Sequence, residues 1–204
     1  MRHLFTFLLS LALIAATGCR HRKPKAPDQL ALPQTTSPTA QKQFSRTVDD
    51  PRLASKGFIF TIDYPTVDWK VYSENLPPDP QVRRIIAIVD KNDNVEIEIN
   101  YGLDIKRNEI YGMLTESQMA AMAFGMSVGE IESFRGGYKL TIYIDDVAPD
   151  GLPLKGQLHM FLFPAESDPR IVIACMIAGD NDAVEKSLDK ITASINSITV
   201  TLMK

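Results

Sequence analysis

The chain has 204 residues, of which 45% are hydrophobic, 23% charged and 8% aromatic, and its formal net charge at pH 7 is −3. These proportions are typical of a globular protein and exclude a collagen-like or wholly disordered chain. Its 2 cysteines and 3 histidines are too few for a disulfide-based scaffold or a zinc module built from Cys and His. The length predicts one domain with its own hydrophobic core.

The first nineteen residues form a pattern of their own. Positive residues at positions 2 and 3 precede the uncharged apolar run Leu4–Ala16, which is too short to cross a bilayer and has the length of a signal-peptide core. Ala16, Thr17 and Gly18 then supply small residues directly before Cys19, and this order resembles a bacterial lipobox. We therefore expect a lipoprotein signal peptide over residues 1–18, with plain secretion as the alternative.

Resemblance to lipoproteins implies that Cys19 carries N-acyl and S-diacyl chains of the palmitate type. More than one acyl chain makes membrane attachment stable. Arg20, and not Asp, follows the cysteine, which resembles lipoproteins that are sent to the outer membrane. The expected location is the bacterial cell envelope, with the chain anchored through Cys19 to the outer membrane and facing the periplasm.

A polar stretch follows the cysteine. It begins with four basic residues that would either contact anionic headgroups or act as a solubilising spacer: Arg20, Arg22, Lys23 and Lys25. The stretch from Ala26 to Asp50 is rich in Pro, Thr, Ser and Gln and has no apolar periodicity. This composition predicts a flexible tether over residues 19–50 and a folded domain over residues 51–204.

The predicted domain is acidic, in contrast to the basic start of the tether. From Ser45 onward there are 16 Lys and Arg against 24 Asp and Glu, a net charge of −8. Nucleic-acid binding needs a positive surface, so we expect no nucleic-acid partner.

In the first half of the domain, alternating apolar residues predict strands over 58–64 and 95–101, and a short second strand is expected over 67–72. Residues 84–90 are apolar on both faces, which predicts a central strand. The turn at 91–94 joins the last two strands into a hairpin. In the strand 95–101, the odd-numbered residues are expected to face the core. Glu96, Glu98 and Asn100 are expected to face water.

In the second half, Thr115 and Gln118 have capping-box spacing and predict a helix that begins near Thr115. Strands are expected over 139–145, 157–163 and 171–178, and a closing helix from about Asp182. Residues 198–202 either extend that helix or form a strand. The expected fold class is α+β, an antiparallel sheet flanked by helices, because no repeated βαβ unit occurs.

Two segments resemble a known family. The run Gly57–Pro65 with Trp69 resembles the opening of the PsbP-like fold, and Ser194–Ile198 resembles its closing helix. Small bacterial lipoproteins of the DcrB kind carry such a domain behind a lipobox. The resemblance implies an α/β/α sandwich that serves as an accessory or assembly protein. The family shares no catalytic set, so it supplies no catalytic residue for this chain.

Candidate sites within the domain are few. Asp145, Asp146 and Asp150 are weak candidates for a Ca²⁺ site on a loop, where a solvated turn explains them equally well. The methionines at 113, 119, 122 and 126 could bind Cu(I), but packing in the core is the favoured interpretation. Cys175 is expected to be a buried, inert thiol, and a dyad with His159 is the weak alternative.

Taken together, these patterns predict a membrane-anchored envelope lipoprotein with a non-catalytic domain that binds a partner or assists assembly. The expected partners are membrane lipid through Cys19 and an envelope protein. We expect no enzymatic activity and no cofactor. The alternative function is a module that binds a small ligand or a metal ion in the envelope.

Overall fold

The computed structural model describes residues 41–53, 55, 57–65, 69–72, 83–90, 94–147 and 153–204. None of the helices in these ranges has the length and hydrophobicity needed to cross a membrane. The elements in chain order are β1 (Gln41–Asp49), β2 (Gly57–Pro65), β3 (Trp69–Tyr72), β4 (Arg83–Asp90), β5 (Val95–Leu103), α2 (Arg107–Ala123), β6 (Ser127–Val128), β7 (Glu132–Phe134), β8 (Gly137–Val147), β9 (Pro153–Pro164), β10 (Ile171–Asp180), α3 (Asn181–Asn196) and β11 (Thr199–Leu202).

The strands form two antiparallel sheets. The large sheet has 8 strands, in the order β3-β4-β5-β10-β9-β8-β6, and β7 pairs with β8 beside that path. The small sheet has 3 strands in the order β1-β2-β11, so strands from the two ends of the domain are joined on β2. The expected antiparallel sheet with helices packed against it is confirmed.

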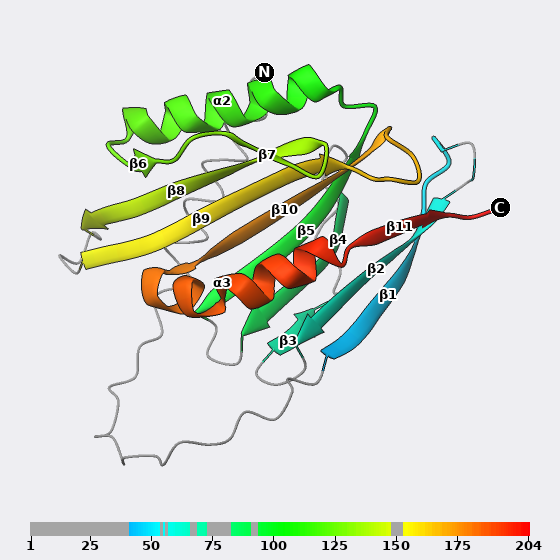
Figure 1. Ribbon diagram of the computed structural model, residues 1–204, viewed down its shortest axis with the longest axis horizontal. Coiled ribbons are helices and arrows are strands. Elements are labelled where there is room, and N and C mark those ends of the chain that lie inside the picture. The colour runs from blue at the N-terminus through cyan, green and yellow to red at the C-terminus, as the bar shows by residue number, and fades with distance from the viewer. Residues whose placement is uncertain are drawn as a thin grey trace, which may run out of the picture.

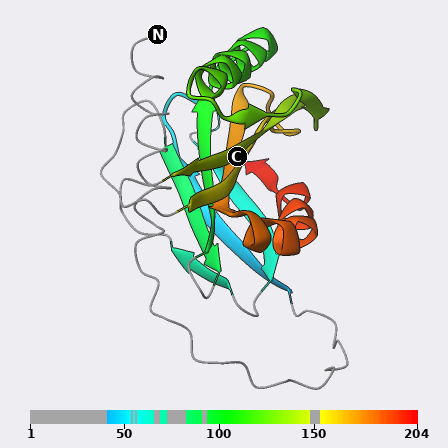
Figure 2. The same cartoon turned by 90° about the vertical axis from the view of Figure 1, so that its left-hand side faces the viewer.

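The elements are arranged in layers around the large sheet. Helix α2 lies on one face, and α3 together with the small sheet lies on the other (Figure 1; Figure 2). The expected α/β/α sandwich is therefore shown only in part, because α3 shares its layer with a second sheet. The sequence analysis did not separate the strands into two sheets.

The register of the central strands fixes which side chains face each layer. Ile99 of β5 lies opposite Cys175 of β10, and Cys175 lies opposite Phe161 of β9. All three side chains are buried in the layer that contains α3 and the small sheet. A shift of one residue in any strand would turn such a row toward the other face, so the buried side chains specify the register.

Two segments differ from expectation. Residues 41–49, which the sequence analysis assigned to the tether, form β1 and pair with β2 along its whole length. Helix α2 begins at Arg107, and not near Thr115, which lies inside the helix with its hydroxyl donating to the Tyr111 carbonyl at 2.9 Å. At the observed helix start, the Lys106 backbone N–H donates to the Glu109 carboxylate at 2.8 Å, which is one half of a capping box.

The early start of α2 changes which of its residues reach the core. Ile110, Leu114 and Ala121 are buried against the sheet, whereas Met119 and Met122 are 66% and 62% exposed. The expectation that these two methionines pack in the core is wrong. On β5, the odd-numbered residues 95–101 are buried as expected, but Asn100 is also buried, because its face of the sheet is covered too.

Candidate functional site

A groove of about 310 Å³ lies beside β11 on the α3 side of the large sheet. Four separate segments supply its walls: the β7–β8 turn, the end of β9 with the loop after it, β10, and the α3–β11 junction. The lining residues are Arg135, Phe163, Ala165, Glu166, Ser167, Ile173, Ile198, Thr199 and Val200. We call this feature the β11 groove.

One wall of the β11 groove is the outer edge of a sheet. The Met203 N–H donates to the Gly57 carbonyl at 3.1 Å, so Thr201 and Thr199, two and four residues earlier, also direct their backbone groups toward β2. The N–H and C=O of Val200 and Leu202 consequently point away from β2. Among the described residues the small sheet ends at β11, and no strand pairs with that side. This edge can accept the backbone of another extended chain.

The base of the groove is apolar. Phe163 of β9 and Ile173 of β10 lie opposite each other in the sheet and are buried, as is Ala165 after β9. Glu166 stands at the rim with 88% of its side chain exposed. The arrangement offers an unpaired strand edge above a rigid apolar base, with polar residues around the opening.

Arg135 closes one end of the groove. It lies in the β7–β8 turn with Gly136, at φ 47° and 78°, the positive values of the tight turns that match strand twist. Its guanidinium stacks over Phe163 at 4.6 Å from the ring centre. It also donates to the carbonyls of Ile195 at 3.0 Å and Ile198 at 3.1 Å, so a cation lies at the C-terminal end of α3, where it is favoured by the helix dipole.

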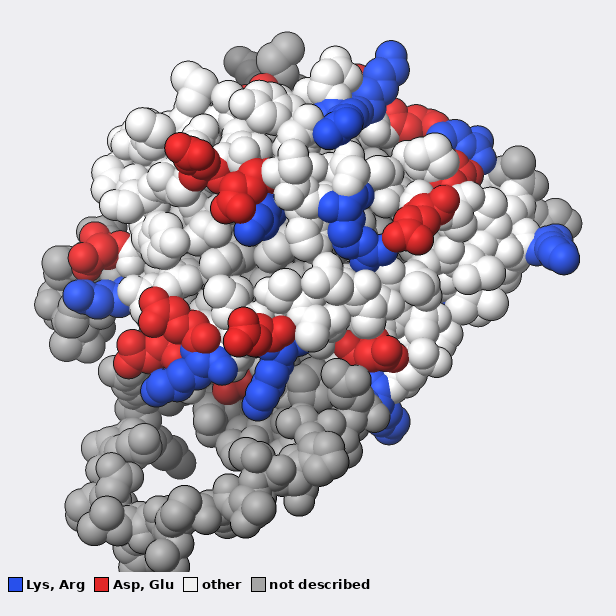
Figure 3. Space-filling model, in the orientation of Figure 1, with Lys and Arg blue, Asp and Glu red and all other residues white. Residues whose placement is uncertain are grey.

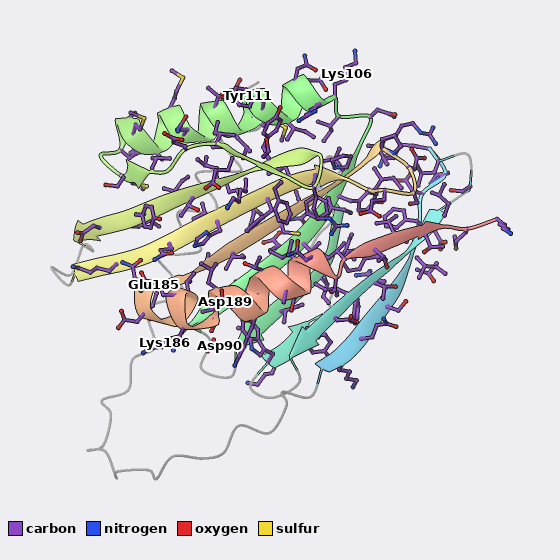
Figure 4. The ribbon with its side chains drawn as sticks, in the orientation of Figure 1. Asp90, Lys106, Tyr111, Glu185, Lys186 and Asp189 are labelled. Atoms are coloured by element: carbon purple, nitrogen blue, oxygen red, sulfur yellow. The ribbon has the colours of Figure 1, made fainter. Side chains whose placement is uncertain are left out.

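A buried polar chain links the sheet to the start of α3. The Thr141 hydroxyl lies 3.0 Å from His159 Nδ1, and His159 Nε2 lies 2.9 Å from Gln157 Oε1. Gln157 Nε2 then donates at 3.1 Å to Glu185, whose place in the first turns of α3 is shown in Figure 4. A neutral imidazole that accepts at Nδ1 and donates at Nε2 satisfies every partner in this chain.

Burial sets the chemistry of His159 and of Cys175. Burial, followed by the nearby charge of Lys139, holds the pKa of His159 below its ordinary value of 6.5. Complete burial raises the pKa of the Cys175 thiol far above its ordinary range. Cys175 lies opposite Phe161, and the hydrogen-bond partners of His159 are Thr141 and Gln157. The thiol is thus buried and protonated, as the favoured sequence interpretation expects.

The residues singled out in the sequence lie away from the groove or outside the described residues. Cys19 and Asp150 fall outside them. Asp145 and Asp146 lie on β8 and not on a loop, and Asp145 Oδ1 is 4.0 Å from Lys155 Nζ. Across the described ranges, no group of three or more His, Cys, Asp or Glu side chains is placed to hold a metal ion.

Two turns at one end of the molecule share a motif that the sequence analysis missed. In Asp50-Pro51-Arg52 and in Asp168-Pro169-Arg170, the aspartate accepts from the backbone N–H and the guanidinium of the arginine two residues later. The Arg170 guanidinium lowers the pKa of Asp168. Tyr101 adds a hydroxyl bond of 3.0 Å to Asp50. The repeated tripeptide is the signal that could have revealed both turns.

Comparison with solved structures gives 11 similar chains, including one of a PsbP protein and one of LpqN. No protein-family model and no curated protein sequence matches the chain. The solution structure of cyanobacterial PsbP (CyanoP) from Synechocystis sp. PCC 6803 is 9% identical, with 84% of this chain and 98% of that chain covered and a TM-score of 0.46. The crystal structure of LpqN, involved in cell envelope biogenesis of Mycobacterium tuberculosis, is 16% identical, with 78% and 91% covered and a TM-score of 0.44. A PsbP protein is thus among the structures to which this chain is similar.

Proposed function

We propose that this protein is a lipid-anchored protein of the bacterial cell envelope whose domain binds a partner protein without catalysing a reaction. Two parts of the chain support the proposal. The order of the uncharged run Leu4–Ala16 and the small residues before Cys19 supports the anchor. The β11 groove supports the binding role, and it is the observation on which the function depends.

The partner contributes an extended segment to this groove. Unpaired N–H and C=O groups along a strand edge are best satisfied by another backbone in the extended conformation, and this mode of binding is common in peptide recognition. Alternate side chains of that segment would point toward the apolar base formed by Phe163 and Ile173. Arg135 already holds the carbonyl of Ile198, so the usable edge begins at Val200.

Photo-cross-linking in growing cells tests the binding role. A photoreactive residue in place of Glu166, at the rim of the groove, is expected to give one protein adduct of defined mass. The same residue in place of Lys190, which is exposed on α3, is expected to give none. Combining Leu202→Pro with the photoreactive residue at position 166 removes a backbone N–H that points away from β2. This should abolish the adduct while the domain stays folded. Equal adducts from both positions would contradict a binding site at the groove.

Intact-mass spectrometry of the membrane-extracted protein tests the anchor. A chain that begins at Cys19 and carries the mass of its acyl chains is the expected result. An unmodified chain cleaved at another position would contradict the anchor and would leave the groove proposal standing.

A further inference from the structure

The outer face of α2 near its C-terminal end is apolar and exposed. Met119, Met122 and Phe124 are 66%, 62% and 63% exposed. Between residues 110 and 129 the only charged side chain is Glu116. Figure 3 shows few charged residues over the end of α2 next to β6, whereas Lys and Arg gather toward its other end. We call Met119, Met122 and Ala123, which lie on one side of the helix at spacings of three and four residues, the α2 patch. Phe124, two residues after Met122, lies on a different side of the helix end.

A helix that covers a sheet in water normally places charged residues on its outer face. The buried face of α2 is already occupied by Ile110, Leu114 and Ala121, so the α2 patch is a second apolar surface that the fold does not use. Exposed apolar side chains gathered in this way mark a surface that binds something apolar. Methionine adapts to irregular or fluid partners because its side chain is long and unbranched.

We propose that the α2 patch docks on the lipid bilayer, with the axis of α2 along the membrane surface. This inference rests on the proposed anchor at Cys19. The 21 residues from Arg20 to Ala40 are predicted to be a tether, and a flexible chain of that length reaches about 25 Å on average. The domain would therefore stay within about its own diameter of the lipid, and a weak apolar surface would meet the membrane constantly.

The orientation places the acidic helix α3 on the far side of the domain. Lys106 and Arg107 are exposed at the start of α2, where cations can contact anionic headgroups, but Asp104, Glu109 and Glu116 are exposed there too, so the contact depends on the apolar residues and not on net charge. Tyr111, labelled beside Lys106 in Figure 4, is 47% exposed and has the amphipathic ring that suits a membrane interface. The acidic residues Asp182, Glu185 and Asp189 lie on α3, on the opposite side of the large sheet. Docking through α2 thus turns these acidic groups away from the lipid.

The same orientation leaves the β11 groove accessible. The groove lies on the α3 side of the large sheet, whereas the α2 patch lies on the other side. A docked domain would therefore present the unpaired edge of β11 away from the bilayer. Lipid and protein partner would occupy opposite faces of one rigid sheet and would not compete.

A single fluorescent label tests the proposal. The membrane-extracted protein with Met122→Cys is labelled with an environment-sensitive dye and reconstituted into vesicles of phosphatidylethanolamine and phosphatidylglycerol, with or without spin-labelled lipid. Cys175 is buried and does not react, and acylated Cys19 has no free thiol. The matched control is Tyr143→Cys, because Tyr143 is 44% exposed and lies on the α3 side of β8.

We expect spin-labelled lipid to quench the dye at position 122 several-fold more than the dye at position 143. Adding Met119→Ser to the Met122→Cys protein should remove that difference, whereas adding Phe124→Ser should not. Neither change should alter the melting temperature. Equal, weak quenching at both positions in protein that floats with the vesicles would overturn docking alone. Protein that does not float would overturn the anchor and the docking with it. A concentration-dependent blue shift at position 122 without quenching would show that a second copy covers the patch, and this too would overturn lipid docking.

Discussion

The two faces of the large sheet are covered to different extents. On one face, α3 and the small sheet pack against β4, β5, β9 and β10 and form one continuous core. On the other face, the described residues that pack against β8, β9 and β10 come mainly from α2, with Val128 of β6 and Ile131 beside it, and the end of α2 exposes Met119, Met122 and Phe124. Because most buried apolar residues lie on the α3 side, that side should contribute most of the free energy of unfolding. The α2 side keeps exposed apolar surface that does not contribute to the core.

The largest expected effect is on the α3 side. Phe60 of β2 is completely buried between the small sheet and the large one. Phe60→Ala should lower the free energy of unfolding by about 3–5 kcal/mol, because it removes buried apolar area and leaves a cavity. Urea denaturation followed by circular dichroism measures this loss. A loss below about 1 kcal/mol would mean that the small sheet contributes little to the core.

The two edges of β11 provide the next test. Thr201 directs its N–H to β2, whereas Leu202 directs its N–H away from β2, along the open edge that continues from the groove. Thr201→Pro should cost about 2–3 kcal/mol, because it removes a ladder hydrogen bond and leaves the facing carbonyl on β2 unpaired. Leu202→Pro should cost only about 1 kcal/mol, chiefly from the loss of the half-buried leucine side chain, since proline is tolerated on the open side of an edge strand. Thermal unfolding of the two variants compares them directly. Equal losses would show that the outer edge of β11 is not open.

A smaller effect depends on pH and concerns His159. Its pKa in the folded chain lies below 6.5 because burial disfavours the imidazolium. As the pH falls below about 6.5, the unfolded chain binds the proton first, so the folded state loses stability until its own pKa is reached. The stability that neutral His159 contributes is therefore full above pH 6.5. Unfolding midpoints measured between pH 7.5 and 5 should fall more for the natural chain than for His159→Gln. Parallel curves would contradict a neutral, buried imidazole.

The sequence predicts the strands that alternate strongly and misses those that depend on their neighbours. β2 and β5 were predicted because their apolar residues repeat with the period of a strand, and β9 and β10 because they are apolar along most of their length. β1 contains only two large apolar residues, Phe44 and Val48, and its extended form comes from pairing with β2. No periodicity within residues 41–49 could have indicated that pairing.

Helix α2 was misplaced because it carries two apolar stripes. Met119, Met122 and Met126 have helical spacing, and so do Ile110, Leu114 and Ala121. The start of the helix at Arg107 and the contacts with β8 decide which stripe is buried. Sequence spacing alone cannot decide between two such stripes.

The β11 groove could not have been predicted from sequence. Its lining comes from segments around residues 135, 165, 173 and 199, which only the fold brings together. Whether β11 has an open edge depends on the order of strands in the small sheet. The sequence left residues 198–202 as helix or strand, so neither the edge nor the groove beside it was visible.

The smallest expected effect is that of Met122→Ala on the α2 side, and Met160→Ala on the same side serves as its comparison. Met160 of β9 is buried beneath the helix at 8% exposure, whereas Met122 is 62% exposed on the outside of that helix. Met160→Ala should cost about 2–5 kcal/mol of unfolding free energy, and Met122→Ala less than about 0.5 kcal/mol. Chemical denaturation of detergent-free protein with Cys19→Ala, at two protein concentrations, measures both. A large, concentration-dependent cost at Met122 would mean that the outer face of α2 is packed against a second copy. A negligible cost would mean that the methionine contributes nothing to folding, so its exposed apolar surface needs a reason outside the fold, and contact with lipid supplies one.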